Sequence, residues 1–171
     1  MSLKLVPDYS FPSITDVSYD FLVNNNITFL LADLDNTIAP YGKSQPAVAV
    51  LKWAEDLRNN GITLFIISNN TKSRPADFAR VFNINHIKRA KKPSRQGVLR
   101  ALELSGKKIE ETAIVGDQIF TDVYAGNRAG VMSILVSPIS LKNPLLAIRY
   151  LFELPFRCMC KSKFKKGKFN E

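Results

Sequence analysis

Short apolar runs alternate with helical patterns along most of this chain, and that alternation limits its fold more than any other feature. The runs have the length of strands and are rich in β-branched residues, and most lead into stretches with apolar residues at helical spacing. Such alternation favours βαβ units with right-handed crossovers. It predicts an α/β fold: a Rossmann-like parallel sheet with helices on both faces. Strands are expected at 27–32, 62–67, 85–88, 112–115 and 131–136, and helices at 46–59, 73–82, 94–104 (capped by Ser94), 121–129 and 144–156.

The distribution of charge separates a domain from a tail. The chain has 171 residues, a length typical of one domain with its own core, and a net charge of +9. Residues 157–171 hold six lysines and arginines against one acidic residue, so they carry more than half of that charge. We therefore expect a single domain over 1–156 and a basic tail over 157–171, which bears on partners more than on the fold.

Nothing in the sequence indicates secretion or a membrane span. The first residues, MSLKLVPDYS, lack the apolar core of a signal peptide, and no stretch approaches the roughly 20 apolar residues that cross a bilayer. The two cysteines, Cys158 and Cys160, form neither a disulfide framework nor a complete zinc-ligand pattern. We expect a cytoplasmic protein.

Two carboxylates, Asp33 and Asp35, follow the first predicted strand in the run DLDNT. In open α/β sheets, ligands bind in the crevice at the carboxyl ends of the strands. One carboxylate at such a place can attack a phosphorus atom, and the other can move a proton. The same residue types also form turns and helix caps. The motif alone therefore leaves an active site and a simple turn equally open.

Three further polar groups occupy the loops that follow other predicted strands. Ser68 and Asn69 offer a hydroxyl and an amide for a phosphate, Lys92 precedes a proline, and Asp117 and Asp122 offer two carboxylates for a hard cation. Each group alone has an ordinary interpretation: a loop, a solvated lysine, or an acidic helix start. Their order and spacing together favour a single phosphate-handling site.

In that order the chain resembles the haloacid dehalogenase superfamily of phosphohydrolases. The pattern is D-x-D-x-T, then a serine after the second strand, then Lys-Pro, then G-D-x-x-x-x-D, over residues 33 to 122. The strings LADLDNTIAP, IISNN, RAKKP and IVGDQIFTDVYAGNRAG are similar to the YqeG family, capless phosphatases of subfamily IIIA. That family is related to phosphatidylglycerophosphate phosphatases.

The resemblance implies roles for the motif residues in a Mg²⁺-dependent hydrolysis of phosphate monoesters. Asp33 would be the nucleophile that forms an aspartyl-phosphate, Asp35 the general acid and base, and Lys92 the charge that stabilises the reacting phosphoryl group. Ser68 and Asn69 would bind the phosphoryl oxygens, and Thr37 would help to orient the loop on the substrate side.

The resemblance also implies a Mg²⁺ site. Its ligands would be Asp33, Asp35 through its backbone carbonyl, Asp117 and Asp122. For Asp122 a second role stays open, that of holding Lys92 in place.

The intervals between the motifs leave no room for a cap domain. Asp35 and Ser68 are 33 positions apart, and Ser68 and Lys92 are 24 apart. An uncapped site favours substrates large enough to close it themselves, and phosphatidylglycerophosphate is the substrate we expect. A phosphoprotein, a nucleotide or a sugar phosphate is the alternative.

The end of the chain bears on where the protein acts. An apolar stretch at 145–152 leads to lysines and phenylalanines at 163–169. Lysines attract anionic lipid head groups and phenylalanine inserts at the interface, so this end predicts peripheral contact with the inner face of a membrane. The helix could equally pack on the sheet while the lysines keep the protein in solution. Nucleic acid is an unlikely partner because no nucleic-acid-binding module accompanies the lysines.

A reading from a different class is a basic membrane- or nucleic-acid-binding protein with a vestigial site. The complete motif set argues against it, because a vestigial site usually lacks the nucleophile or a metal ligand. The sequence leaves the oligomeric state open.

Overall fold

The computed structural model describes residues 5–160 and 162–163. Most of the basic tail, and with it most of the expected membrane contact, lies outside the described residues.

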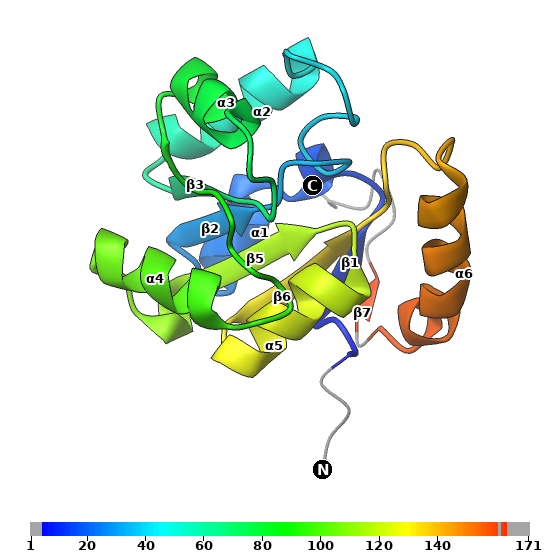
Figure 1. Cartoon of the computed structure of the whole chain (residues 1–171). Helices are drawn as coiled ribbons and strands as arrows, with labels where there is room; N and C mark the ends of the chain where they lie inside the picture. The colour runs from blue at the N-terminus through cyan, green and yellow to red at the C-terminus, as the bar shows by residue number, and fades with distance from the viewer. Residues whose placement is uncertain (1–4, 161, 164–171) are drawn as a thin grey trace.

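In the described part of the chain, seven parallel strands form one sheet, which confirms the predicted Rossmann-like architecture. Their order across the sheet is β4-β3-β2-β5-β6-β1-β7 (Figure 1). The interior strand β2 pairs with β3 and β5, so that Leu31 lies opposite both Phe65 and Ile114. The strands are β1 (Tyr9–Phe11), β2 (Phe29–Ala32), β3 (Thr63–Ile67), β4 (Asn85–Ile87), β5 (Thr112–Gly116), β6 (Met132–Val136) and β7 (Ser162–Lys163).

Helices cover both faces of the sheet, as predicted. Buried residues of α1, α2 and α3 pack on one face, and those of α4 and α5 pack on the other (Figure 1). The helices are α1 (Tyr19–Asn24), α2 (Val48–Asn59), α3 (Arg74–Phe82), α4 (Gln96–Ser105), α5 (Tyr124–Ala129) and α6 (Pro144–Cys158), with 3-10 turns η1 (Ile14–Asp16) and η2 (Ile109–Glu111) and a π-helical turn η3 (Ile119–Val123).

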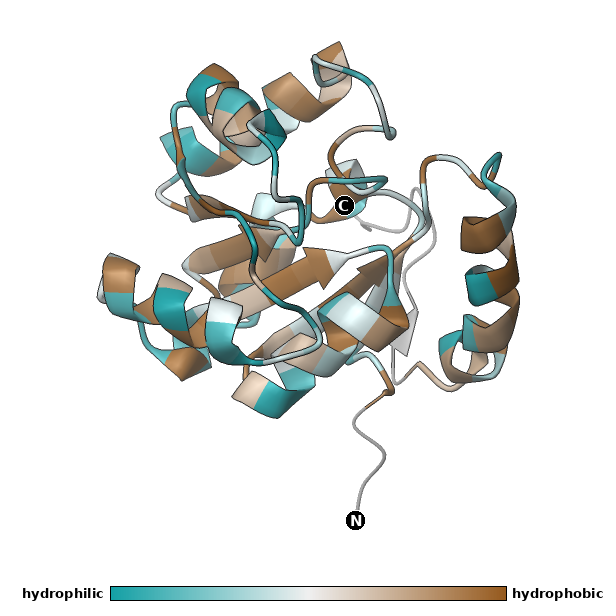
Figure 2. Ribbon diagram, in the orientation of Figure 1, coloured by the Kyte–Doolittle hydropathy of each residue, from teal (hydrophilic) through white to brown (hydrophobic). Residues whose placement is uncertain are grey.

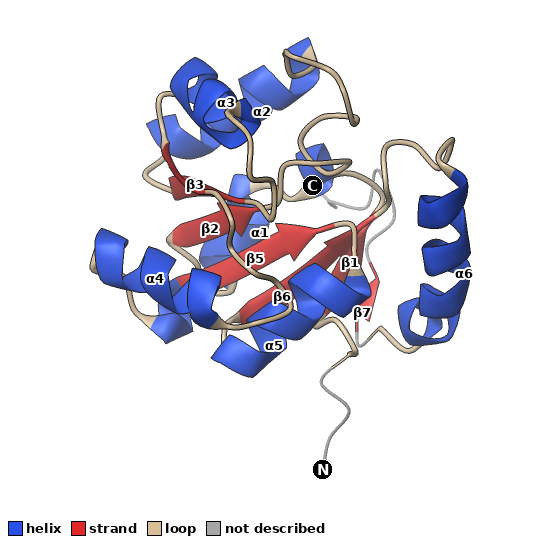
Figure 3. Cartoon of the chain, in the orientation of Figure 1, coloured by secondary structure: helices blue, strands red, loops and turns tan. Residues whose placement is uncertain are grey.

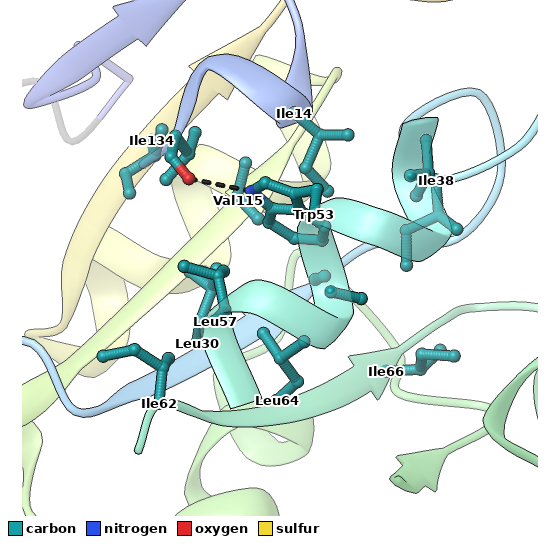
Figure 4. Packing of buried hydrophobic residues seen from close by; sticks show 14 of the residues in the cluster. Ile14, Leu30, Ile38, Trp53, Leu57, Ile62, Leu64, Ile66, Val115 and Ile134 are labelled. Carbon is teal, nitrogen blue, oxygen red and sulfur yellow. Dashed lines mark hydrogen bonds between the residues drawn. The ribbon is translucent and has the colours of Figure 1, made fainter. Parts of the chain in front are cut away.

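Strand β2 is buried in both directions, which explains its continuous apolar sequence. Leu30 and Ala32 point into the cluster formed with α2 and α3, while Phe29 and Leu31 point into the cluster formed with α4 and α5. Trp53 of α2 lies in the first cluster and donates its indole N–H to the carbonyl of Val17 at 2.8 Å (Figure 4). The loop after β2 therefore starts from a strand that is buried along its whole length.

Sequence patterns missed β1, α1 and β7. Strand β1 has three residues and β7 has two, so neither shows a periodicity. Both extend one edge of the sheet, because β1 pairs with β6 and β7 pairs with β1. These short elements owe their structure to pairing with strands that are distant in the sequence.

Several expected boundaries also differ. Helix α2 begins at Val48 instead of residue 46, and β2 begins at Phe29 instead of residue 27. Helix α4 begins at Gln96 with Arg95 as N-cap instead of Ser94, although the Ser94 hydroxyl still accepts a hydrogen bond from the Gln96 N–H at 3.3 Å. The helix expected at 121–129 consists of the turn η3 followed by α5. Helix α6 ends at Cys158, so Arg157, which we had assigned to the tail, belongs to this helix.

No further domain interrupts the motif-bearing segment. Helix α2 alone separates β2 from β3, and α3 alone separates β3 from β4. The predicted absence of a cap domain is therefore confirmed. Among the described residues, none of the helices combines the length and the apolar character needed to cross a bilayer.

Helix α6 stands beside the sheet, and it buries a charged residue while it exposes several apolar ones. Glu153 is its buried residue, at 1% exposure. Apolar side chains point to solvent instead, and Figure 2 shows brown along much of this helix. The exposed ones include Leu145, Ile148, Leu151 and Phe152.

Candidate active site

The motif residues converge at the carboxyl ends of three neighbouring strands. Asp33 follows β2, Ser68 follows β3 and Asp117 follows β5 (Figure 3). Because these strands are parallel and adjacent, their C-terminal loops meet at one edge of the sheet. A cavity of about 130 Å³ lies between these loops, with Asp33 and Lys92 in its lining.

A tight turn after β2 sets the positions of the DLDNT residues. Asn36 adopts a left-handed backbone conformation with φ of 69°, and its N–H donates to the carbonyl of Ala39 at 2.7 Å. Its side-chain oxygen also accepts from the Ser140 N–H at 2.9 Å. The Thr37 hydroxyl donates to Asp117 at 3.2 Å. The turn is thus tied to the β5 loop and to the segment before α6.

Lys92 lies at the centre of the site, with its ammonium between two carboxylates. Its Nζ is 2.6 Å from Asp33 and 2.5 Å from Asp122, and it also donates to the carbonyl of Ile67 at 3.0 Å. Burial alone would lower the pKa of Lys92, but Asp122 and Asp33 outweigh burial and raise that pKa above its usual range. Lys92 therefore stays charged, whereas its neighbour Lys91 is exposed.

Asn69 fixes the backbone at Lys92. Its amide nitrogen donates to the carbonyl of Lys92, and its amide oxygen accepts from the N–H of Lys92, each at 2.8 Å. The side chain of Asn69 is thus engaged with the lysine loop. Ser68 is buried, and its hydroxyl accepts from the N–H of Asn70 at 3.1 Å.

Three buried carboxylates gather beside Lys92. Oxygen atoms of Asp33, Asp117 and Asp122 lie within 4.8 Å of one another. Burial raises the pKa of Asp117 to about 7, and Asp122 adds to the shift. Burial likewise raises the pKa of Asp33 well above its usual range, although the charge of Lys92 opposes that shift.

This cluster fits a divalent cation. Three carboxylates cluster around one ammonium, and two of them, Asp33 and Asp122, are within hydrogen-bond distance of it. Full ionisation therefore leaves an excess of two negative charges over the Lys92 ammonium in a buried site. A divalent cation would balance that excess, and carboxylate oxygen is the ligand that hard cations prefer.

Asp122 comes close to the strand end because residue 116 is glycine. A Cβ at Gly116 would lie 2.3 Å from the Asp122 carboxyl group, which no real contact permits. The second oxygen of Asp122 accepts from the Gln118 N–H at 3.2 Å. Both oxygens of Asp122 are therefore already engaged, one by Lys92 and one by the backbone.

Asp35 is oriented by groups from the segment after β3. Arg74 donates its Nε–H to one oxygen of Asp35 at 2.8 Å, and Asn70 donates to the other at 3.3 Å. Arg74 itself is anchored on the carbonyls of Pro40 (2.9 Å) and Lys43. A second cavity of about 370 Å³ adjoins Asp35 on this side, between the loop after β2 and α3.

The structure also places at the site residues to which the motifs assigned no role. Arg74, which belongs to none of the motifs, contacts Asp35 directly. Asn36 connects the turn to Ser140, 104 positions away. Arg149 of α6 lines the cavity that contains Asp33. The helical spacing of 149 and 153 was the only signal, and it does not tell which way the side chains point.

Comparison with known proteins identifies the family of this chain. The model of the haloacid dehalogenase-like hydrolases matches residues 23–130, the segment that carries every motif. The chain belongs to this family. A curated relative named "Probable phosphatase YqeG", from Bacillus subtilis (strain 168), is 32% identical over 135 residues, which cover 79% of this chain and 78% of the relative. The expected resemblance is confirmed, and the chain is a phosphatase of the haloacid dehalogenase type.

Solved structures of other proteins share the fold. A 3-deoxy-D-manno-octulosonate 8-phosphate phosphatase from Yersinia pestis matches with a TM-score of 0.55 at 18% identity, over 86% of this chain and 76% of that one. The cobalt-bound deoxy-D-mannose-octulosonate 8-phosphate phosphatase from Haemophilus influenzae matches with a TM-score of 0.51 at 14% identity, over 78% of this chain and 91% of that one. At these identities the likeness concerns the fold. Haloacid dehalogenase-type phosphatases use a divalent metal, in keeping with the carboxylate cluster.

The affinity of this phosphatase for a divalent cation, tested with Mg²⁺, is expected to fall at acid pH. Because burial raises the pKa of Asp117 to about 7, a proton competes with the cation for this carboxylate below that pH. The dissociation constant for Mg²⁺ should rise by up to about tenfold per pH unit below about pH 7 and level off above it. Titration calorimetry in buffers of different ionisation enthalpy measures both the affinity and the proton released. Equal affinity and no proton release on both sides of that pH would contradict the expectation.

Proposed function

We propose that this phosphatase hydrolyses phosphate monoesters with the help of Mg²⁺ and through an aspartyl-phosphate on Asp33. The observation that carries the proposal is the position of the Asp33 carboxylate, 2.6 Å from a buried, charged lysine and beside two further buried carboxylates. Phosphoryl transfer depends mainly on positioning and on neutralising charge, and this cluster offers both.

Each half of the reaction uses the two aspartates of the DLDNT turn. Asp33 attacks the phosphorus atom, the bond to the leaving oxygen breaks, and Asp35 gives a proton to that oxygen. Asp35 then takes a proton from a water molecule that attacks the phosphorus, which releases phosphate and restores Asp33. Arg74 and Asn70 hold the carboxyl group of Asp35 in one orientation for both transfers.

The remaining motif residues would bind the metal ion and the phosphoryl group and neutralise their charges. Asp33, Asp117 and the backbone carbonyl of Asp35 would hold Mg²⁺, which lets two anions approach each other. Asp122 would keep Lys92 in place, since both of its oxygens are engaged. Ser68 and the backbone N–H of Asn69 would bind phosphoryl oxygens, because the amide side chain of Asn69 is committed to Lys92. Thr37 orients Asp117.

Phosphatidylglycerophosphate is the substrate that we propose. Three features support a lipid: the site has no cap domain, α6 exposes Leu151 and Phe152, and the sequence after α6 is rich in lysine and phenylalanine. An exposed apolar helix followed by lysines suits the surface of an anionic membrane, so we propose peripheral contact at its cytoplasmic face.

Phosphate release from several substrates, with and without Mg²⁺, tests the proposal. The panel contains phosphatidylglycerophosphate in mixed micelles, a phosphopeptide, a nucleotide and a sugar phosphate. We expect release to require Mg²⁺ and to be fastest with the lipid. Turnover of soluble esters only would keep the chemistry and refute the lipid substrate. No release from any of them would refute the proposed hydrolysis.

A further inference from the structure

Helix α6 places one charged side chain, Glu153, in a buried position next to the loop after β5. Glu153 accepts hydrogen bonds from the backbone N–H groups of Ile119 at 3.0 Å and Phe120 at 3.3 Å. These N–H groups open the turn η3, just after Asp117. A carboxylate at this point satisfies donors that the start of a helical segment leaves unpaired. Glu153 thus holds the loop that presents Asp117.

Two arginines flank Glu153 one helical turn away on either side. Arg157 donates to Glu153 at 3.0 Å and to the backbone carbonyl of Asp117. Arg149 approaches Glu153 at 3.8 Å and the Asp117 carboxylate at 3.9 Å. The contacts of Arg157 have the length of hydrogen bonds, whereas those of Arg149 do not. Arg157 is therefore hydrogen-bonded to the loop, whereas Arg149 interacts with it only through longer electrostatic contacts.

Arg149 is the member of this group that reaches the active site. It lines the cavity that also contains Asp33, Asp35 and Lys92, and 27% of its side chain is exposed. Among the described residues no acceptor lies within hydrogen-bond distance of its buried Nε. A guanidinium has five N–H donors in a planar fork that matches the oxygens of a phosphate group. Arg149 thus lines the cavity that a phosphate must enter, and its guanidinium makes no hydrogen bond within the described part of the chain.

We propose that Arg149 binds a phosphate oxygen of the substrate, and that Glu153 and Arg157 position it together with the Asp117 loop. The inference rests on the proposed function, because it takes the substrate to be a phosphate ester. A phosphate group adds up to about two negative charges to a cluster that Lys92 and a divalent cation only just balance. Arg149 supplies the further positive charge. Helix α6 thereby gives this uncapped site a substrate contact from outside the motifs.

Two phosphates could meet Arg149: the one that is transferred, or a second one on the leaving group. Inorganic phosphate as a product inhibitor reports on the first. A sugar bisphosphate compared with para-nitrophenyl phosphate reports on the second, because only the bisphosphate carries another phosphate.

The decisive variant is Arg149→Met, which keeps the length of the side chain and removes its charge. The matched control is Arg100→Met, the same change on the exposed side of α4. Losing a hydrogen bond to a charged group should raise KM, or the inhibition constant of phosphate, about tenfold to a hundredfold. We expect kcat to change far less, and Arg100→Met to behave as the wild type.

The variant Glu153→Gln tests whether the charge of Glu153 positions Arg149 or whether Glu153 only supports the fold. The amide keeps an oxygen for the two N–H groups but loses the charge that holds the arginines. It should raise KM in the wild-type background and add little in the Arg149→Met background, since contacting residues are not additive. Full additivity would overturn the positioning role of Glu153.

Several outcomes would overturn the role of Arg149. If the wild type turns over substrate and Arg149→Met has the same KM and the same inhibition constant for phosphate, this inference is refuted and the proposed function stands. If the wild type releases no phosphate, the proposed function fails, and calorimetric binding of inorganic phosphate with Mg²⁺ still compares Arg149→Met with the control. If Arg149→Met does not fold, Arg149→Lys retains the charge without the fork, and an unchanged KM in that variant refutes fork-like binding.

Discussion

Replacing Asp33 with asparagine is expected to lower phosphate release by at least about a thousandfold, an effect typical of removing a nucleophile. An amide has nearly the same shape as a carboxylate but cannot attack phosphorus. The variant should fold normally, because it removes a carboxylate whose pKa is raised by burial and so relieves the cost of burying its charge. Phosphate release at saturating Mg²⁺, beside a thermal unfolding curve, measures both effects.

The control for this variant is Asp56→Asn, the same change at an exposed position of α2. It should retain wild-type turnover. If Asp33→Asn turned over substrate as fast as this control, Asp33 would not be the nucleophile and the proposed chemistry would be wrong.

Replacing Lys92 with methionine is expected to damage both stability and activity. The change leaves the carboxylates of Asp33 and Asp122 buried without the cation that they share. Breaking a buried ion pair by removing one partner costs about 3–5 kcal/mol. Loss of a preorganised charge at the reacting group should also slow phosphate release by about a hundredfold to a thousandfold.

The matched control is Lys91→Met, since Lys91 is the exposed neighbour of Lys92. Urea unfolding and phosphate release compare the two variants. The instability of Lys92→Met should shrink as the pH falls, because burial raises the pKa of Asp33 and its protonation in the folded state removes an unpaired buried charge. If both variants were equally stable and equally active, the buried ammonium would have neither role.

The sequence predicted the sheet well because its strands are buried on both faces. Continuous apolar runs such as 27–32 and 62–67 are recognisable without any knowledge of their partners. Their parallel pairing then brings the residues after each run to one edge, so Asp33, Ser68 and Asp117 were expected together and lie together.

Helix α6 was harder to predict because its pattern is inverted. Its apolar residues left two arrangements open, contact with a membrane or packing on the sheet; in the structure Leu151 and Phe152 are exposed and Glu153 is buried. Hydrophobic periodicity assigns the apolar side to the interior. It therefore gave no sign that the charged residues of α6 reach the loop after β5.

Contacts between distant segments could not be derived from spacing at all. The partner of Asp35 is Arg74, 39 positions later, and the partner of Asn36 is Ser140. Both depend on how loops from different strands meet. The same holds for β1 and β7, because such short strands are defined by the strands they pair with and carry little pattern of their own.

The measurement that tests the central claim most directly is the trapping of phosphate on Asp33. Wild-type protein turning over para-nitrophenyl phosphate with Mg²⁺ is quenched in acid, reduced with borohydride and analysed by peptide mass spectrometry. We predict that residue 33 carries the product that borohydride forms from an acyl phosphate. This reduced residue should be absent from Asp33→Asn and from wild-type protein without Mg²⁺. Steady turnover without this reduced residue at position 33, or with phosphate on another residue, would contradict the account.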